Sequence, residues 1–154
     1  MLYCSLYFLD NVDMSNFQFI PSKEMKVDVS KEQQKQISSK ESIKKACKKR
    51  NVIAFDIIID DKIIGFAMLR RYARHGYFLW DYAIDKDYQN KGYGSEVLKE
   101  LFSLIKNKYK AKEMTTTYIW GNEHAKHLYE KVGFVETDVV DEPDCHEVNM
   151  IIKL

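Results

Sequence analysis

The sequence is poor in cysteine, proline and glycine, and each shortage excludes a class of protein. The 154 residues include three cysteines, two prolines and six glycines. Cys4, Cys47 and Cys145 are far apart and lack Cys-x-x-Cys or paired Cys/His spacing, so they predict neither a disulfide framework nor a metal site. Scarce proline and glycine also exclude a collagen-like or disordered chain. We therefore expect reduced thiols in a folded protein.

An excess of charge of one sign and a long apolar run are also missing. Lys and Arg number 24 against 23 for Asp and Glu, so the bulk charge does not indicate binding to nucleic acid or to a membrane surface. No apolar run approaches the roughly 18 residues of a membrane-spanning helix, and residues 1–10 lack the features of a signal peptide. The expectation is a soluble, cytoplasmic protein.

What the sequence does contain is material for one hydrophobic core. Of its residues 45% are hydrophobic and 31% are charged, at a length for which one domain is expected rather than two. We therefore predict a single domain that spans residues 1–154.

The hydrophobic pattern predicts an α/β arrangement of strands and amphipathic helices. Runs rich in β-branched and aromatic residues predict strands at residues 2–9, 52–59, 63–72, 76–85, 114–120, 134–140 and 147–154. Helical spacing of apolar residues predicts one helix at 95–108 and another that Asn122 caps and Gly133 ends. The Lys-rich stretch between residues 10 and 50 is weakly periodic and predicts only a helix around residues 42–49.

A glycine-bearing turn between a strand and a helix is the clearest indication of a ligand site. The turn comprises Gln89, Asn90, Lys91, Gly92, Tyr93, Gly94 and Ser95. A turn that enters a helix leaves backbone N–H groups free, and the helix dipole there favours an anion. Gly92 and Gly94 would let a pyrophosphate approach the backbone without a Cβ in the way. The P-loop and dinucleotide patterns are absent, and a plain strand-to-helix connection is the alternative interpretation.

This turn and a second motif resemble the GCN5-related N-acetyltransferase (GNAT) family. The pyrophosphate loop of that family has the pattern Gln/Arg-x-x-Gly-x-Gly/Ala, which is Gln89-x-x-Gly92-x-Gly94 here. Further on, Asn122 and the segment Leu-Tyr-Glu-Lys-Val-Gly-Phe at 128–134 resemble the family's helix after its fifth strand. The two motifs in this order imply an acetyl-CoA-dependent N-acetyltransferase.

The resemblance covers about residues 52–154 and implies a fold. It is the single-domain GNAT fold of the α/β (α+β) class, with a mixed, mostly antiparallel sheet flanked by helices. In that fold the sheet splays between strands four and five, which are residues 76–85 and 114–120 here. The resemblance is also compatible with a homodimer.

The resemblance further implies where acetyl-CoA binds. The main chain of Tyr82, Ala83 and Ile84 would pair with the pantetheine arm like an added strand. The amides of residues 90–95 would hold the pyrophosphate, and Asn122 would hydrogen-bond the cofactor. No metal is expected.

Two histidines are the remaining candidates for metal ligands. His124 and His127 have i, i+3 spacing on a predicted helix, but no third ligand is spaced with them. We therefore expect solvated helix positions rather than a metal site.

Tyr129 is the candidate catalytic acid. Collapse of the tetrahedral intermediate expels a thiolate, which a phenol of pKa about 10 can protonate or hold by a hydrogen bond. The alternative is an ordinary tyrosine at the core edge, because Tyr129 shares its helix face with Ala125, Leu128 and Val132.

Asp81 is the candidate base, because an attacking amine must lose a proton. It lies between Trp80 and Tyr82 in an aromatic strand, where burial would raise the pKa of its carboxyl. Asp81 would accept the proton directly or through water. The alternative is a strand-end carboxylate that pairs with Arg70 or Arg71.

The acceptor class follows from a closer resemblance and from charge. Residues 79–84 are similar to the strand of the family's diamine (spermidine/spermine) acetyltransferases in which an aspartate faces a cationic substrate. Those enzymes have glutamate in place of Trp80 and glycine in place of Asn90. In that family the loop between the last two strands borders the acceptor entrance, so the resemblance implies that an acidic turn there would attract a polycation, whereas plain surface is the alternative interpretation. The acidic residues of this turn are Asp138, Asp141, Glu142 and Asp144.

We therefore expect the partner to be a small-molecule amine acceptor, with polyamines as the leading class. An aminoglycoside, an amino acid or a protein amine would use the same site and is the first alternative. A regulatory module that binds acyl-CoA without turnover is the second alternative.

Overall fold

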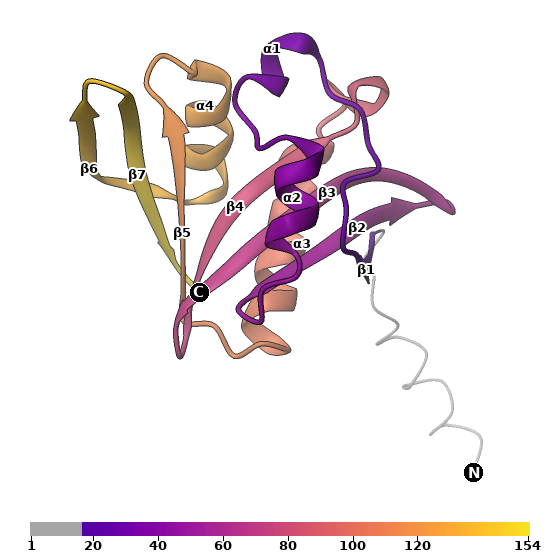
Figure 1. Ribbon diagram of the computed structural model, residues 1–154. Coiled ribbons are helices and arrows are strands. Elements are labelled where there is room, and N and C mark those ends of the chain that lie inside the picture. The colour runs from indigo at the N-terminus through magenta and orange to yellow at the C-terminus, as the bar shows by residue number, and fades with distance from the viewer. Residues whose placement is uncertain (1–16) are drawn as a thin grey trace.

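A computed structural model describes residues 17–154, which form one seven-stranded sheet with helices on both faces (Figure 1). The strands are β1 (Gln18–Pro21), β2 (Val52–Ile59), β3 (Lys62–Ala73), β4 (Gly76–Ile84), β5 (Glu113–Ile119), β6 (Val135–Glu142) and β7 (Cys145–Lys153). The helices are α1 (Lys31–Gln34), α2 (Lys40–Ala46), the 3-10 turn η1 (Lys86–Tyr88), α3 (Tyr93–Asn107) and α4 (Glu123–Val132). None of the helices within residues 17–154 combines the length and hydropathy of a membrane span.

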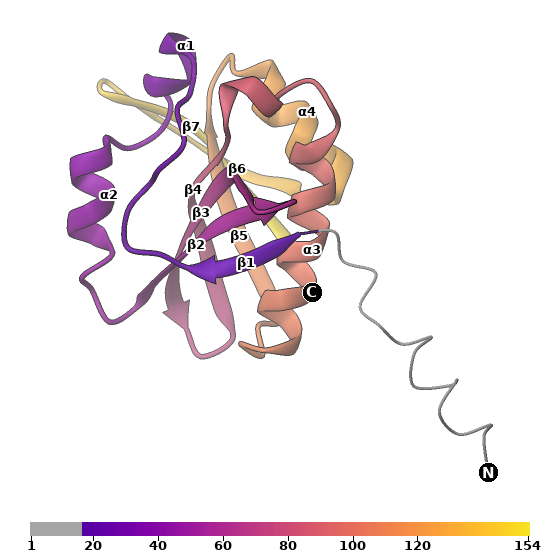
Figure 2. The same cartoon turned by 90° about the vertical axis from the view of Figure 1, so that its right-hand side faces the viewer.

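The strands follow the order β1-β2-β3-β4-β5-β7-β6, and β4 and β5 are the parallel pair. All the other neighbours are antiparallel. Figure 2 shows α1 and α2 on one side of the sheet and α3 and α4 on the other. The predicted mixed, mostly antiparallel sheet flanked by helices is confirmed.

Several predicted boundaries were wrong. The strand predicted at residues 2–9 lies outside the described residues, whereas the short β1 and α1 were not predicted at all. Helix α2 begins at Lys40, earlier than predicted, because the Ser39 side chain accepts a hydrogen bond from the Ser42 amide and caps it. Helix α3 begins at Tyr93, because Gly92 adopts φ +83° and directs the chain into the helix there.

The last two strands also run further than predicted. β6 ends at Glu142 and β7 begins at Cys145, so Asp138, Asp141 and Glu142 lie on a strand, and of the predicted acidic turn Asp144 alone lies in the turn. The hairpin register places Asp141 opposite His146 and Glu142 opposite Cys145. Both strands are longer than predicted because the pairing of β6 with β7 continues to the tip of the hairpin.

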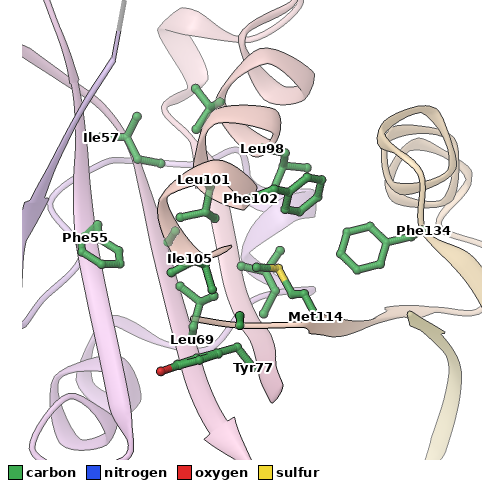
Figure 3. Close-up of a cluster of buried hydrophobic side chains, with 14 of the residues drawn as sticks. Phe55, Ile57, Leu69, Tyr77, Leu98, Leu101, Phe102, Ile105, Met114 and Phe134 are labelled. Atoms are coloured by element: carbon green, nitrogen blue, oxygen red, sulfur yellow. The ribbon is translucent and has the colours of Figure 1, made fainter. Parts of the chain in front are cut away.

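The main core lies between the sheet and helices α3 and α4. Leu98, Leu101 and Ile105 of α3 are fully buried against Leu69 and Met114 of the sheet (Figure 3). A second cluster packs α2 against the opposite face, where Ile43 and Ala46 meet Phe66 and Met68. Each face of the sheet is therefore covered by an apolar layer.

The parallel strands β4 and β5 pair over a short stretch, and the opening beyond that stretch is the candidate site. Only residues 76–78 of β4 pair with 113–115 of β5. Beyond this point β4 stays paired with β3 as far as Ile84, while β5 stays paired with β7 as far as Ile119. The two strands therefore diverge, as Figure 1 shows, and the predicted splay between strands four and five is confirmed.

A bulge in β4 accompanies the divergence. The register between β3 and β4 shifts where Met68 faces Asp81 and Leu69 faces Leu79, which leaves Trp80 as the extra residue. Trp80 packs against the cluster beneath α2, whereas Leu79 belongs to the cluster beneath α3. The bulge thus turns Asp81 toward the face that α1 and α2 cover.

Candidate active site

The turn at residues 89–95 leads from the diverging end of β4 into α3. Asn90 and Gly92 adopt positive φ values of 60° and 83°. A Cβ at Gly92 would meet no atom within 4 Å, and at Gly94 the nearest atom would be Leu128 Cδ1 at 3.6 Å. The backbone conformation accounts for Gly92, but internal packing does not require Gly94. The helix entrance is therefore open to an approaching group.

Two side chains hold this turn in place. Gln89 Nε2 donates to the carbonyl of Ile84 at 2.8 Å, which closes the turn onto the end of β4. The Tyr82 hydroxyl donates to the carbonyl of Gly94 at 2.7 Å and ties β4 to the first turn of α3. Burial raises the pKa of Tyr82 well above its ordinary value, with a further contribution from Tyr129. Gln89 and the Tyr82 side chain act as supports for the turn.

Tyr129 lies on α4, half-buried beside the opening. Its ring packs edge-on against Phe134 with 5.5 Å between centroids. Burial raises the pKa of Tyr129 to about 12, the charge of Asp81 adds to this effect, and the Thr116 hydroxyl opposes it. Tyr129 therefore carries its proton at neutral pH. Tyr129 thus packs against the core, as the alternative interpretation expects, and its hydroxyl is affected by Thr116 and Asp81 at the opening between β4 and β5.

Thr116 is a site residue that the sequence analysis missed. It is buried on β5, and its hydroxyl donates to the carbonyl of Leu79 at 3.1 Å. This bond joins β4 and β5 just beyond the last paired residues of the two strands. Thr116 alternates with Met114 and Tyr118 on the buried face of β5, and this alternation was the signal that could have identified it.

Asp81 is 3% exposed, and its carboxylate is only partly satisfied. Oδ1 accepts a hydrogen bond from the Ser38 amide at 2.9 Å, while Oδ2 is buried with no partner within residues 17–154. Burial raises the pKa of Asp81, and the bonds from Ser38 oppose the rise. One carboxylate oxygen is thus held in place and the other is free to accept a proton.

The alternative pairing of Asp81 with an arginine is wrong in the described part of the chain. Arg70 stacks over the rings of Phe78 and Trp80, at 5.5 Å from each centroid. Arg71 donates to the backbone carbonyls of Ala73, at the end of β3, and of Arg74, in the turn that follows. The two guanidinium groups are therefore engaged elsewhere.

Asn122 follows β5 on the other side of the opening. Its Oδ1 accepts a hydrogen bond from the Ala125 amide at 3.1 Å and caps α4, as predicted. Its Nδ2 donates to Gln36 Oε1, so both ends of the side chain already have protein partners. The hydrogen bond from Asn122 to a cofactor stays a prediction.

The acidic residues of the last hairpin lie at a different place from Asp81. Asp141 Oδ1 is 2.6 Å from His146 Nδ1, and these two residues line an open hollow of about 390 Å³ with Trp120. Ser38, which contacts Asp81, instead lines a hollow of about 320 Å³ that also involves Asp28. Of these two hollows within residues 17–154, neither is lined by both the acidic hairpin and Asp81.

The chain matches the family model of the acetyltransferase (GNAT) family over residues 15–134. A curated relative, the probable spermine N(1)-acetyltransferase of Bacillus subtilis subsp. natto (strain BEST195), is 33% identical over 79 residues. That match covers 47% of this chain and 52% of the relative, so the chain spans about half the length of the curated relatives it matches.

Two solved structures share the fold. A GNAT family acetyltransferase from Elizabethkingia anophelis with acetyl-CoA bound has a TM-score of 0.70 and 19% identity, and the match covers 91% of this chain and 99% of that one. Spermidine N-acetyltransferase from Vibrio cholerae in complex with CoA and spermine has a TM-score of 0.63 and 18% identity, covering 75% and 76%. At these identities the likeness concerns the fold.

Proposed function

The chain belongs to the GNAT family of acetyltransferases, and on this basis we propose that it transfers the acetyl group of acetyl-CoA to a primary amine. The observation that carries the proposal is the divergence of β4 and β5 beside the uncovered N-terminus of α3. This arrangement provides a backbone edge for an extended arm and free amides for the phosphates that follow it. The similar structure from Elizabethkingia anophelis contains acetyl-CoA, which supports the proposal.

The binding residues of the proposal come from β4 and the turn that follows it. The main chain of Tyr82, Ala83 and Ile84 is the edge that pairs with the pantetheine amides. The amides of residues 90–95 bind the pyrophosphate at the start of α3, where the helix dipole adds to the attraction. Support for this assignment comes from Gly94, which internal packing does not require.

In the proposed reaction the amine nitrogen attacks the thioester carbonyl and forms a C–N bond. The free oxygen of Asp81 accepts the amine proton, directly or through water. The C–S bond then breaks, and Tyr129 donates its proton to the leaving thiolate or holds it by a hydrogen bond. The raised pKa of Tyr129, about 12, keeps the hydroxyl protonated at neutral pH and favours the hydrogen bond to the thiolate over full transfer of the proton.

We further propose a small cationic amine, such as a polyamine, as the acceptor. A buried carboxylate with one unpartnered oxygen attracts an ammonium group and then accepts its proton. Sequence similarity to a probable spermine acetyltransferase over 79 residues points the same way.

The test is thiol release by the purified protein with acetyl-CoA and a panel of amines. The panel contains spermine, spermidine, putrescine, an aminoglycoside, an amino acid and an uncharged aromatic amine. Turnover of the polyamines is expected. Turnover of the aromatic amine alone would reject the cationic acceptor, and CoA binding without any turnover would favour a regulatory module.

A further inference from the structure

One short segment, residues 33–38, contacts both sides of the opening between β4 and β5. Gln33 Oε1 accepts a hydrogen bond from Gln89 Nε2 at 2.6 Å, on the β4 side. Gln36 Oε1 accepts one from Asn122 Nδ2, on the β5 side. The segment therefore bridges the two rims at the ends of the strands.

The same segment also holds the candidate base. The Ser38 amide donates to Asp81 Oδ1 at 2.9 Å, and its position leaves the other carboxylate oxygen free. We refer to the two bridging glutamines and the serine that holds Asp81 as the clasp. Its members are Gln33, Gln36 and Ser38.

The two side-chain bonds of the clasp have a fixed direction. Gln89 Nε2 also donates to the Ile84 carbonyl, so this end of the amide must be the nitrogen. Asn122 Oδ1 accepts from the Ala125 amide, so its nitrogen must point toward the clasp. Both clasp glutamines therefore serve as acceptors, and a carboxylate of the same shape would preserve each contact.

The clasp lies on the side of the sheet opposite the open helix entrance. Figure 2 shows α1 and α2 on one side and α3 and α4 on the other. In the proposed reaction acetyl-CoA is held from the α3 side, and the amine reaches the acetyl group near Asp81. The clasp thus borders the path of the acceptor and contacts the phosphate-binding turn through the Gln89 side chain.

We propose that Gln33, Gln36 and Ser38 are positioning residues, which keep the two rims of the opening and the Asp81 carboxylate in the arrangement that receives the amine. This inference rests on the proposed function. It separates two properties of the site: the clasp governs the use of the acceptor, whereas cofactor affinity does not depend on it. Gln89 keeps its bond to Ile84 without the clasp, so the phosphate-binding turn stays in place.

The experiment compares two double variants of the complete chain. Gln33→Ala with Gln36→Ala removes both acceptors, whereas Gln33→Glu with Gln36→Glu keeps an oxygen at each position. The alanine pair should lower kcat/KM for the amine by about 3- to 10-fold, the range expected for hydrogen bonds of ordinary strength. The glutamate pair should retain most of the activity, and the uncharged alanine pair should bind CoA with the wild-type Kd in calorimetry.

A second measurement does not depend on turnover. Hydrogen exchange of the Ser38 amide, followed by NMR, reports its bond to Asp81, and it should become faster in the alanine pair but not in the glutamate pair. Lys35→Ala is the matched control, because this exposed residue lies in the same segment. It should alter neither the exchange nor the kinetics.

The two proposals fail in different ways. If the wild-type protein binds CoA but acetylates no amine, the proposed function is rejected, and the exchange of Ser38 still decides whether the clasp holds Asp81. If the alanine pair exchanges Ser38 at the wild-type rate and keeps its kcat/KM, the clasp is rejected. Equal losses in the alanine and glutamate pairs would also overturn it, because the acceptor oxygens would then be irrelevant.

Discussion

At the scale of single residues, burial gives Tyr129 and Asp81 opposite but complementary properties. Burial raises the pKa of both groups, because it disfavours the charged form of each. For the phenol this means that the proton is retained at neutral pH and can hold the leaving thiolate by a hydrogen bond, although the hydroxyl is a weaker acid, and for the carboxylate it means greater basicity. The negative charge of Asp81 also adds to the raised pKa of Tyr129, so the charge of Asp81 acts on Tyr129 across the opening.

The Tyr129→Phe variant tests the proton donor. Phenylalanine keeps the edge-on contact with Phe134 but loses the hydroxyl, so the fold and the Kd for CoA should not change. Because general acid catalysis typically contributes about 10² to 10⁴-fold, kcat should decrease by a factor in that range. Steady-state kinetics combined with calorimetry measures both quantities. An undiminished kcat would assign Tyr129 to the core edge.

The Asp81→Asn variant tests the buried charge through stability. Because the folded-state pKa of Asp81 is raised above its ordinary value of 3.8, its carboxyl stabilises the protein below that pH, and this stability is lost as pH rises through the folded pKa. Asparagine keeps an acceptor for the Ser38 amide without the charge. Its Tm should exceed that of the wild type at pH 7, and the difference should shrink toward pH 3.8.

The same variant has a functional consequence. Without the carboxylate, kcat/KM for a cationic amine should fall, and the loss should diminish at higher pH, where more of the amine is already neutral. A stabilised variant with full activity would show that Asp81 is buried for structural reasons alone.

At the scale of elements, the first turn of α3 combines two functions. Gly92 directs the chain into the helix through its positive φ, and Gly94 leaves the helix entrance uncovered. Tyr82 fixes this entrance to β4, which provides the edge for the pantetheine arm. The phosphate and pantetheine sites of the proposal are therefore rigidly linked.

The Gly94→Asp variant separates folding from binding. A carboxylate in the first turn of a helix is favourable by about 0.3–1 kcal/mol, so the free energy of unfolding should not decrease. The same charge would repel a pyrophosphate, and the Kd for CoA should rise about tenfold or more. Gly94→Ala is the control, because the added methyl group would be in ordinary contact with Leu128. Equal Kd values for Gly94→Asp and the wild type would exclude the turn as the phosphate site.

At the scale of the whole molecule, the opening between β4 and β5 is held by a few contacts. The strands pair over residues 76–78 and 113–115, Thr116 adds one bond, and the clasp connects the far rims. A ligand that lies between the strands would replace missing sheet contacts. Binding should therefore stabilise the entire fold.

Ligand-linked stability tests this view. If acetyl-CoA binds only the folded chain, a concentration of roughly 100 times Kd should add about 2.7 kcal/mol to the free energy of unfolding. Urea unfolding with and without acetyl-CoA measures the difference. The Gly94→Asp variant should show a much smaller gain at the same concentration. An equal gain in that variant would place the ligand elsewhere.

Local sequence determined much of this protein. The Asn122 cap, the Gly133 stop and the strands from Val52 onward depend on neighbouring residues, and periodicity and capping chemistry predicted them. The glycine turn was also recognisable, because positive φ and close approach restrict the residue type. The turn at residues 89–95 could therefore be identified before the fold was known, whereas Tyr129 and Asp81 were singled out through the resemblance to the GNAT family and the chemistry that it implies.

Only the tertiary structure decided what surrounds Asp81, Gln89 and Asn122. Their clasp partners are 43, 56 and 86 positions away in the chain, in a stretch without clear periodicity. Such contacts depend on the register of β3 and β4, on the bulge at Trp80 and on the short pairing of β4 with β5. Hydrogen bonds between distant segments leave no periodic pattern in a sequence, because each needs only one polar atom at the right place in space.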